Sequence, residues 1–436
     1  MNTDQQPFAA SRCTRRALVR QGILAVGGVS AAGLLCSAGL QARSFNIEGK
    51  VMSPNDPTAA SPVIINALLA ANLDFGFRLQ NTLLKSDFTQ NLFFSPLSVS
   101  TALDMVYNGA AGTTLQAMAA TLGLKTLRQA DVNAAMLSIL NRLRKRDPKI
   151  TLSIADSIWL RKGLVAVPSF ITALQTYYGA MLSNLDFNDP QAPSIINAWV
   201  SQQTHKLIPS IVDAIDASVV MYLINAVYFK APWALPFHTT ATSPGTFTIS
   251  TGKTITVPMM SNEGMFSYAK SDTNEIIRLP YGAEKISMYI VLPVDNNSLK
   301  VLLSSLNGAT WNALLKTLTP QHGSIRLPKF SLTYEKGLKP ALATLGMEEA
   351  FDPSKAKFPG IAKGESVSIS EVKHKAIIKV DESGTLAAAV TSVELVAAAV
   401  LSSGMFDMIV NRPFFCAIRD DVTGTLLFMG VVLDPS

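Results

Sequence analysis

The residue types that could carry catalysis or hold a metal are few in this chain of 436 residues. It has four histidines, His205, His238, His322 and His374, and three cysteines. No HExxH, CxxC or GxSxG sequence occurs, nor does a phosphate loop of the form GxxxxGKS or GxxxxGKT. A zinc site, an acyl-transfer serine and a nucleotide site therefore lack their usual signatures. We expect no metal, no cofactor and no enzymatic activity.

The cysteines offer neither a disulfide framework nor a reactive thiol. Cys13 and Cys36 belong to the N-terminal segment, which leaves Cys416 alone in the rest of the chain. Cys416 stands in an apolar run, Pro413 to Ile418, with no cation or histidine beside it in the sequence to lower its pKa. We interpret it as a buried strand residue.

The N-terminus has the pattern of an export signal. Thr14 to Arg20 resembles a twin-arginine signal, and an uncharged run from Gly22 to Leu40 follows it. Small residues allow cleavage after Ala38 or Ala42. We expect a bacterial protein exported to the periplasm or the extracellular space, with membrane anchoring through an uncleaved signal as the alternative. Residues 1–42 are then the signal and 43–61 a flexible leader.

The charge of the chain argues against a nucleic-acid partner. The formal net charge is +6, and the first 42 residues supply +3 of it, from four arginines against one aspartate. The remaining +3 is small for the surface of such a chain. The adjacent basic residues near the middle of the sequence favour a solvated helix face; they are Arg142, Arg144, Lys145 and Arg146.

A segment near the C-terminus does not look like an ordinary connection. A strand is predicted over His374 to Asp381, and a polar turn with glycine, Glu382 to Thr385, follows it. From Leu386 to Val396 there is neither proline nor glycine, although loops usually contain such breakers. Alternate positions from Thr385 onward are small or apolar: Thr385, Ala387, Ala389, Thr391, Val393 and Leu395. The run could lie as a strand with that face buried, but alanine also favours a helix, so composition alone leaves both open.

The elements that would position these residues form an α+β pattern. Helical spacing covers residues 64–84, 96–108, 113–123 and 194–205, with Thr113 and Thr114 as the expected cap of the third helix. Strand patterns dominate later, at 150–160, 219–229, 246–249, 255–258, 274–279, 287–292, 324–332, 414–419 and 426–433. With 48% hydrophobic and 16% charged residues, one large core is feasible, and we expect a single domain over residues 62–436.

Four separated stretches resemble one known family. They are Asn91 to Ser98, Ile196 to Val200 with Thr204, Asn225 to Trp233 with Pro236 and Phe237, and Phe428 to Pro435. Together with the turn at Glu382, they are similar to the serpins, over about residues 62–435. The resemblance implies a serpin fold, with about nine helices around three mostly antiparallel or mixed β-sheets and an exposed reactive-centre loop.

The resemblance also implies a function, suicide inhibition of serine-type endopeptidases. A protease would cleave the loop near Ala398–Ala399, and Gly384–Val396 would then insert into the main sheet. The hinge would comprise Glu382, Gly384, Thr385, Ala387, Ala388 and Ala389. The stretch before Pro413 is longer than usual, so Val400, Leu401 or Met405 are alternative cleavage positions. The apolar residues before the bond suit an elastase-like or subtilisin-like serine protease, with a cysteine protease as a further option.

Two further groups of residues have counterparts in the family. His374 matches the "shutter" histidine, with Ser95, Ser98 and Asn225 as its expected neighbours, and Trp233 matches the tryptophan of the "breach", where insertion begins. The alternative function is that of a non-inhibitory serpin acting as a binding or chaperone-like protein, but the three small hinge residues, Ala387 to Ala389, argue against it. We expect a monomer, with a polymerisation hazard because the insertable strand is apolar.

Overall fold

The computed structural model describes residues 60–296, 298–364, 366–385 and 405–436. The chain separates into two units, residues 1–48 and 49–436, and all of the described residues belong to the second. The predicted export signal and all but the last two residues of the predicted leader lie outside the described residues.

Four helices come first in the described chain: α1 (Pro62–Ser86), α2 (Pro96–Tyr107), α3 (Gly112–Leu122) and α4 (Gln129–Arg144). Proline follows the N-cap serine in the first two, where its missing N–H costs nothing. Ser95 caps α2, its hydroxyl accepting from Ser98 N at 3.1 Å. The later helices are α5 (Pro168–Ala173), which continues into a π-turn η1 (Leu174–Tyr178), α6 (Ala192–Gln203), the 3-10 turn η2 (Thr239–Ala241), α7 (Ser298–Ser305), α8 (Gly308–Lys316), α9 (Lys339–Leu342), the π-turn η3 (Ala343–Met347) and α10 (Glu348–Phe351).

A six-stranded sheet contains the described part of the predicted hinge, Gly384 and Thr385. Its order is β11 (Phe330–Gly337), β13 (Glu371–Asp381), β14 (Gly384–Thr385), β5 (Met221–Pro232), β2 (Thr151–Arg161) and β4 (Met181–Leu185). β13 and β5 also pair directly and in parallel over seven residue pairs, from Glu371↔Tyr222 to Ile377↔Tyr228. β14 lies between the same two strands beyond that ladder.

A nine-stranded sheet and a small one complete the described fold. The first has the order β1 (Leu92–Phe94), β17 (Leu426–Val432), β16 (Phe414–Asp420), β9 (Ile286–Pro293), β8 (Asn274–Tyr281), β7 (Thr254–Lys270), β10 (Thr319–Pro328) and β15 (Phe406–Ile409), with β6 (Ser243–Thr248) paired to β7. The second pairs β12 (Ala362–Lys363) with β3 (Val165–Ala166).

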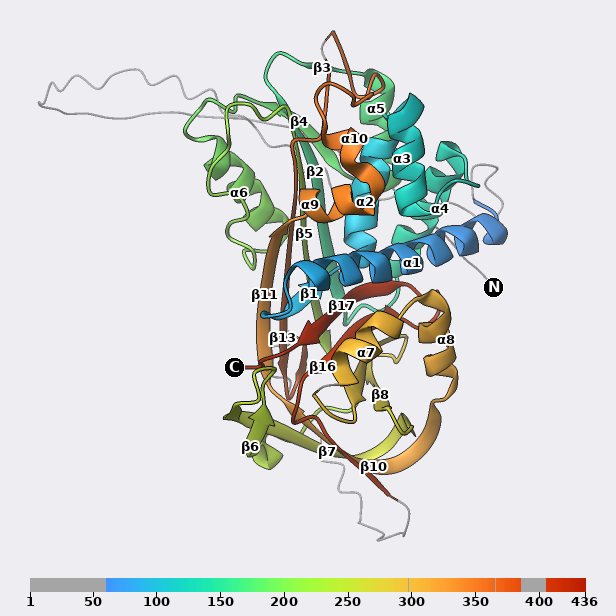
Figure 1. Cartoon of the computed structure of the whole chain (residues 1–436), viewed down its shortest axis with the longest axis vertical. Coiled ribbons are helices and arrows are strands. Elements are labelled where there is room, and N and C mark those ends of the chain that lie inside the picture. The colour runs from blue at the N-terminus through green and yellow to red at the C-terminus, as the bar shows by residue number, and fades with distance from the viewer. Residues whose placement is uncertain (1–59, 297, 365, 386–404) are drawn as a thin grey trace, which may run out of the picture. The chain divides into compact units, whose positions relative to one another are not determined.

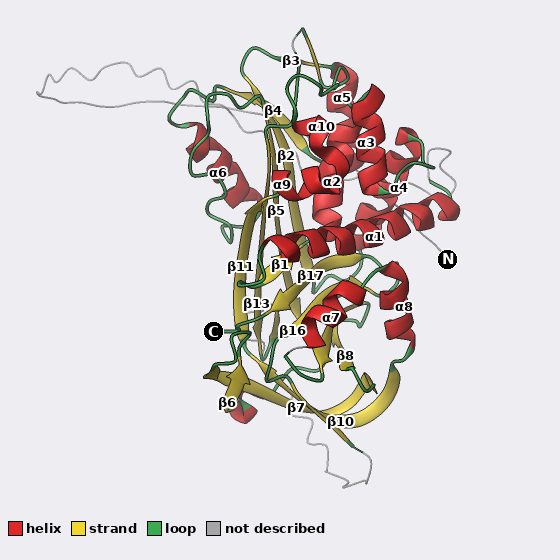
Figure 2. Cartoon of the chain, viewed as in Figure 1, coloured by secondary structure: helices red, strands yellow, loops and turns green. Residues whose placement is uncertain are grey.

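Helices cover both faces of the six-stranded sheet. Figure 1 shows its long strands running vertically, with α2 and its neighbours on one side and α6 on the other. Ile196 and Val200 of α6 are buried in a small separate core with Trp159 of β2 and Ile224 of β5. The main core includes residues of α1, α2 and α4 and of the nine-stranded sheet. Figure 2 shows these helices gathered on the side of the six-stranded sheet opposite α6. The strands are therefore buried on both faces, which explains why β5 reads as a continuous apolar run.

α1 is long and apolar enough to cross a membrane by length and composition. It packs against α2, α4 and β17, and ten of its residues are buried. Within the described structure α1 is a core helix.

Three sequence predictions need correction. Ala111, not Thr113 or Thr114, is the N-cap of α3, and both threonines donate instead to Glu349, Thr114 at 3.0 Å. The single strand expected at 324–332 is two strands, β10 and β11, because the chain passes from one sheet to the other around Lys329. The short strand at 255–258 is part of the seventeen-residue β7.

Candidate functional site

The described part of the predicted hinge is its beginning. Ala387, Ala388, Ala389 and the predicted reactive bond Ala398–Ala399 lie outside the described residues. The described site therefore comprises Glu382 to Thr385, with the strands and side chains around them.

Gly384 and Thr385 form β14, a short strand between β5 and β13. Thr385 pairs with Val380 of β13 and with Ala231 of β5, and both pairings are antiparallel. The two long strands pair directly at one end of the sheet, whereas at the other end the hinge lies between them. A strand that continued beyond Thr385 in the same direction would enter the parallel ladder.

The side chain of Thr385 is fully buried beneath this end of the sheet. Its hydroxyl is 2.6 Å from the hydroxyl of Tyr281, which is itself fully buried. The Tyr281 ring stacks on Trp233, with 4.3 Å between ring centroids. The indole Nε1 of Trp233 donates to the carbonyl of Asp381 at 2.9 Å, and its backbone N–H donates to the carbonyl of Ser383 at 3.0 Å. Trp233 thus holds both ends of the turn that leads into β14.

Gly384 has a backbone that other residues would not adopt. Its φ is +148°, and a Cβ added there would lie 2.1 Å from the carbonyl oxygen of Ala231. Glycine is therefore required where the hinge enters the sheet.

Glu382 is fixed by a cation and a hydroxyl. Its carboxylate lies 2.9 Å from Lys329 Nζ and accepts from Thr242 Oγ1 at 2.8 Å, and its carbonyl accepts from Phe237 N at 2.9 Å. Partial burial acts to raise the pKa of Glu382, but the hydrogen bonds from Lys329 and Thr242 outweigh it and leave the pKa below its ordinary value.

The predicted shutter residues meet where β5 and β13 pair directly. His374 is paired with Asn225, and its Nδ1 hydrogen-bonds the Asn225 side-chain oxygen. The other ring nitrogen, Nε2, accepts from Ser95 N at 3.3 Å. Asn225 Nδ2 donates to the carbonyl of Ser98 at 3.0 Å and to its hydroxyl. The four residues therefore tie the N-terminus of α2 to the two strands.

The fifth member of this group, Asp156, was not predicted from the sequence. Asn225 is paired with Asp156 of β2, so that His374, Asn225 and Asp156 form one row across the strands β13, β5 and β2. We call these three residues the shutter row. Asn225 Nδ2 donates to Asp156 Oδ1. The available signal was the one carboxylate in a predicted strand, with alanine and isoleucine before it, since such groups are buried only where a partner exists.

Burial shifts both ionisable groups of the row toward their neutral forms. Desolvation lowers the pKa of His374 to about 3. Desolvation also raises the pKa of Asp156 to about 7, although the hydrogen bond from Asn225 and the charge of Arg144 act in the opposite direction. A neutral His374 with its proton on Nδ1 fits the geometry, because Nε2 accepts a backbone N–H.

No cluster of three or more histidine, cysteine or acidic residues that could hold a metal occurs among the residues that the structure describes. Cys416 is buried, and burial raises the pKa of its thiol to about 12, so that it stays protonated at neutral pH. The described part of the predicted hinge, Gly384 and Thr385, lies between β5 and β13.

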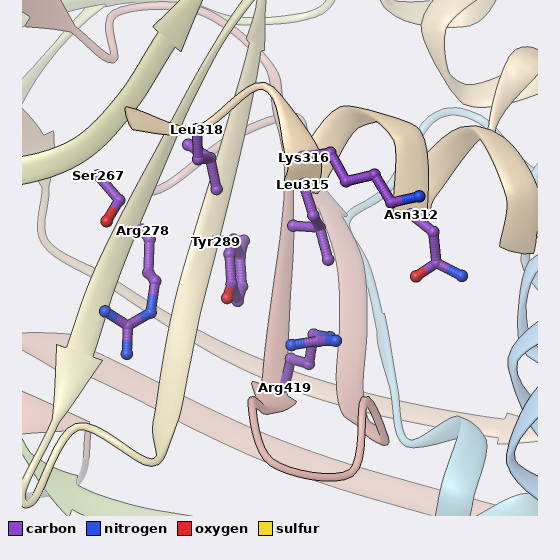
Figure 3. A pocket seen from close by; sticks show the side chains of 8 residues that line it. All are labelled: Ser267, Arg278, Tyr289, Asn312, Leu315, Lys316, Leu318 and Arg419. Atoms are coloured by element: carbon purple, nitrogen blue, oxygen red, sulfur yellow. The ribbon is translucent and has the colours of Figure 1, made fainter. Parts of the chain in front are cut away.

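A second feature is a shallow cavity of about 480 Å³ beside the nine-stranded sheet (Figure 3). Arg278 of β8, Arg419 of β16 and Lys316 of α8 line it, and Tyr289 of β9 lies between the arginines. Asp421 accepts from Arg278 Nε and Arg419 Nη1, each at 3.0 Å. Asp421 thus pairs with two of the three cations, and the lining of the cavity has an excess of positive charge.

Comparison with known proteins agrees with this architecture. The family model described as serpin (serine protease inhibitor) matches residues 70–435. The chain is 31% identical over 380 residues to leukocyte elastase inhibitor A of Rattus norvegicus, covering 84% of this chain and 99% of the relative. The native-state structure of the thermophilic serpin tengpin is 33% identical, with a TM-score of 0.79 over 85% of this chain and 94% of tengpin.

A third similar protein is named for binding a hormone. The structure of human thyroxine-binding globulin, determined with its hormone, is 25% identical, with a TM-score of 0.80 over 86% of this chain and 100% of that one. The predicted fold, with about nine helices and three sheets, is confirmed by these comparisons. On the family match and its coverage, the chain belongs to the serpin family.

Proposed function

We propose that this serpin inhibits serine endopeptidases as a suicide substrate and is not itself a hydrolase. A protease cleaves near Ala398–Ala399 and forms an acyl-ester with the loop. Gly384–Val396 then enters the six-stranded sheet and draws the attached protease along before the ester is hydrolysed.

The observation that carries this proposal is the position of β14. It lies between β5 and β13 at one end of the sheet, and beyond β14 these two strands pair directly with each other. β14 is antiparallel to both β5 and β13, whereas β5 and β13 are parallel to each other. Insertion would replace one parallel ladder with two antiparallel ladders, each at least as stable per residue. The loop would gain backbone hydrogen bonds on both sides, which favours the inserted form.

The shutter row opposes the same movement. His374 and Asn225 belong to the ladder that must separate, so a strand advancing beyond Thr385 would break their hydrogen bond. Breaking a buried polar pair costs free energy until new partners are found. The row therefore supports the intact form, while the alternate small residues after Thr385 fit the buried face of a new strand.

We further propose an elastase-like or subtilisin-like target. Val396, Ala397 and Ala398 would fill small apolar pockets of a protease, and one relative is named for inhibiting leukocyte elastase. The protein would act as a monomer after export through the twin-arginine-like signal. Mass spectrometry of the secreted protein tests the export step, and a mature N-terminus within the folded region beyond Ser61 would contradict it.

The decisive experiment mixes the purified protein with elastase-like and subtilisin-like proteases. We expect a covalent complex that survives SDS, together with release of the peptide that follows the cleaved bond. Rapid cleavage with no covalent complex across a broad panel of serine proteases would refute inhibition.

One observation favours a second function, that of a binding protein. Three cations and an aromatic side chain line the cavity of Figure 3, and the similar thyroxine-binding globulin was solved in complex with a hormone. Such a cavity suits an anionic aromatic ligand. Titration with anilinonaphthalene sulfonate, compared between the wild type and Lys316→Gln, tests this function. Equal fluorescence in the two proteins would contradict it.

A further inference from the structure

A cavity of about 330 Å³ is lined by residues of α4, β2 and η1, among them Asp156 of the shutter row. It is separate in sequence and in lining residues from the cavity of Figure 3. Its volume is at the lower end of the range of small-molecule sites.

Aliphatic side chains from α4 and β2 form part of the cavity wall, and the polar residues Arg144, Thr151, Ser153, Asp156 and Tyr178 line the rest. Leu140 and Leu143 of α4 face Leu152 and Ile154 of β2 across it. Arg144, at the end of α4, is exposed and passes over Gly179, where an added Cβ would lie 3.4 Å from the guanidinium Nη2. No ion pair to Arg144 is present in the described structure. A cation at the rim of an aliphatic cavity can bind a ligand that is apolar at one end and anionic at the other.

Asp156 joins this cavity to the shutter. It lines the cavity and also accepts the hydrogen bond from Asn225, which in turn bonds His374. Asp156 follows Leu152 and Ile154 at alternate positions of β2, so the three share one face. A molecule in the cavity therefore lies next to Asp156, which is one residue away from the His374–Asn225 pair that would separate if the sheet opened.

The strand that forms the cavity wall is also paired with β5. β2 and β5 pair over ten residues, from Thr151↔Lys230 to Leu160↔Met221. If β5 moves away from β13, β2 must move with it or lose this ladder. A ligand in contact with β2 and α4 together would resist that movement.

We propose that this cavity binds a small amphipathic carboxylate, with its aliphatic tail against the leucine and isoleucine walls and its carboxylate on Arg144. We propose also that the bound carboxylate slows loop insertion by holding β2 against α4. The second statement rests on the proposed inhibitory function, whereas the first does not depend on it.

Binding is tested without any protease, by calorimetric titration of the intact protein with decanoate. We expect saturable binding to the wild type, at least about tenfold weaker binding to Arg144→Gln because a charge-assisted hydrogen bond is lost, and partial retention in Arg144→Lys. Arg142→Gln is the matched control, an exposed arginine in the same turn that does not line the cavity. Acetate, which lacks the tail, should not bind. No binding of decanoate, or equal binding by the wild type and Arg144→Gln, would overturn the proposal.

A pH profile provides a readout that a nonspecific surface site would not show. The groups that act on Asp156 or line the cavity with it are Arg144, Tyr178 of η1, and His374 through Asn225, and Asp104 of α2 acts on Tyr178. Burial raises the pKa of Tyr178 and lowers that of His374, so neither of these two changes charge near neutral pH, and burial also raises the pKa of Asp104. Ionisation of Asp156 would repel the ligand, so affinity should fall between about pH 6 and about pH 8. Asp156→Asn should remove the fall, and an unchanged profile in this variant would place the ligand elsewhere.

The effect on insertion is measured by the fluorescence change after loop cleavage, with and without saturating decanoate. We expect slower insertion in the wild type and no effect in Arg144→Gln. If decanoate binds but leaves the insertion rate unchanged, the proposed effect of the ligand on insertion is refuted and the proposed binding site is not. If no insertion occurs at all, the proposed function fails while the calorimetric result still decides the site.

Discussion

The shutter row contains two buried groups whose titrations have opposite effects on stability. Between about pH 4 and about pH 6.5 the unfolded chain protonates a histidine, whereas native His374, with a pKa of about 3, stays neutral. Acidification therefore favours the unfolded chain through His374. In the same range native Asp156, with a pKa of about 7, keeps a proton that the unfolded chain releases. Acidification therefore favours the native protein through Asp156.

Each of these groups changes the free energy of unfolding by up to about 1.4 kcal/mol per pH unit, because each binds one proton more in one of the two states, native or unfolded, than in the other. In the wild type the two contributions cancel over this range. His374→Gln leaves Asp156 alone, so the stability of this variant relative to the wild type should rise by up to about 1.4 kcal/mol per unit of acidification. Asp156→Asn leaves His374 alone, and its relative stability should fall by a similar amount.

The assay is urea unfolding followed by tryptophan fluorescence at a series of pH values, with each variant compared with the wild type so that all other groups cancel. His238→Gln is the matched control, because His238 is exposed and far from the row in sequence. We expect the control to differ from the wild type by a constant. The quantity compared is the free energy of unfolding of each variant minus that of the wild type. If this difference does not change with pH for His374→Gln and Asp156→Asn, or changes in the same direction for both, the two groups do not have opposite effects on stability and the reasoning is wrong.

Three further predictions concern the hinge. Thr385→Arg would bury a charge beside Tyr281 at a cost of several kcal/mol, so we expect the protease to cleave this variant without being trapped, measured as a rise of at least about tenfold in the stoichiometry of inhibition. Thr385→Ser keeps the hydroxyl and should still trap the protease. Trapping by the arginine variant would contradict the buried position of Thr385. Lys329→Met removes the cation beside Glu382 and should lower stability by about 1 kcal/mol in urea unfolding, since Lys329 is partly exposed; an unchanged midpoint would mean that the ion pair contributes nothing. Gly384→Ala places a Cβ against a neighbouring carbonyl and should expel β14, seen as faster amide exchange at Thr385; unchanged exchange would show that the backbone can adapt.

The elements of the fold could be predicted where local chemistry is strong. Ser95 followed by Pro96 marks the start of α2, and the apolar run around Asn225 is β5. The cap of α3 could not be predicted, because Thr113 and Thr114 bond Glu349, more than two hundred residues away. The division of residues 324–332 depends on which sheet each half joins, and sheet membership is a tertiary property.

The site was predictable only in part. Family resemblance named His374 and Asn225, but it did not point to Asp156, whose position is set by strand register. The alternation of small residues from Thr385 onward predicts that Thr385 faces the buried side, and Thr385 is buried. Its hydrogen bond to Tyr281 and the stacking of Tyr281 on Trp233 join strands that are far apart in the sequence. Hydrogen bonds between distant strands leave no periodic trace in a single sequence.

Inhibition by this mechanism requires the cleaved loop to become a strand of the six-stranded sheet. The most direct test is the thermal midpoint of the protein after a protease has cut within residues 386–404, compared with that of the intact protein. We expect the cut form to melt well above the intact form, because two antiparallel ladders have replaced one parallel ladder. Equal midpoints for the two forms would contradict insertion.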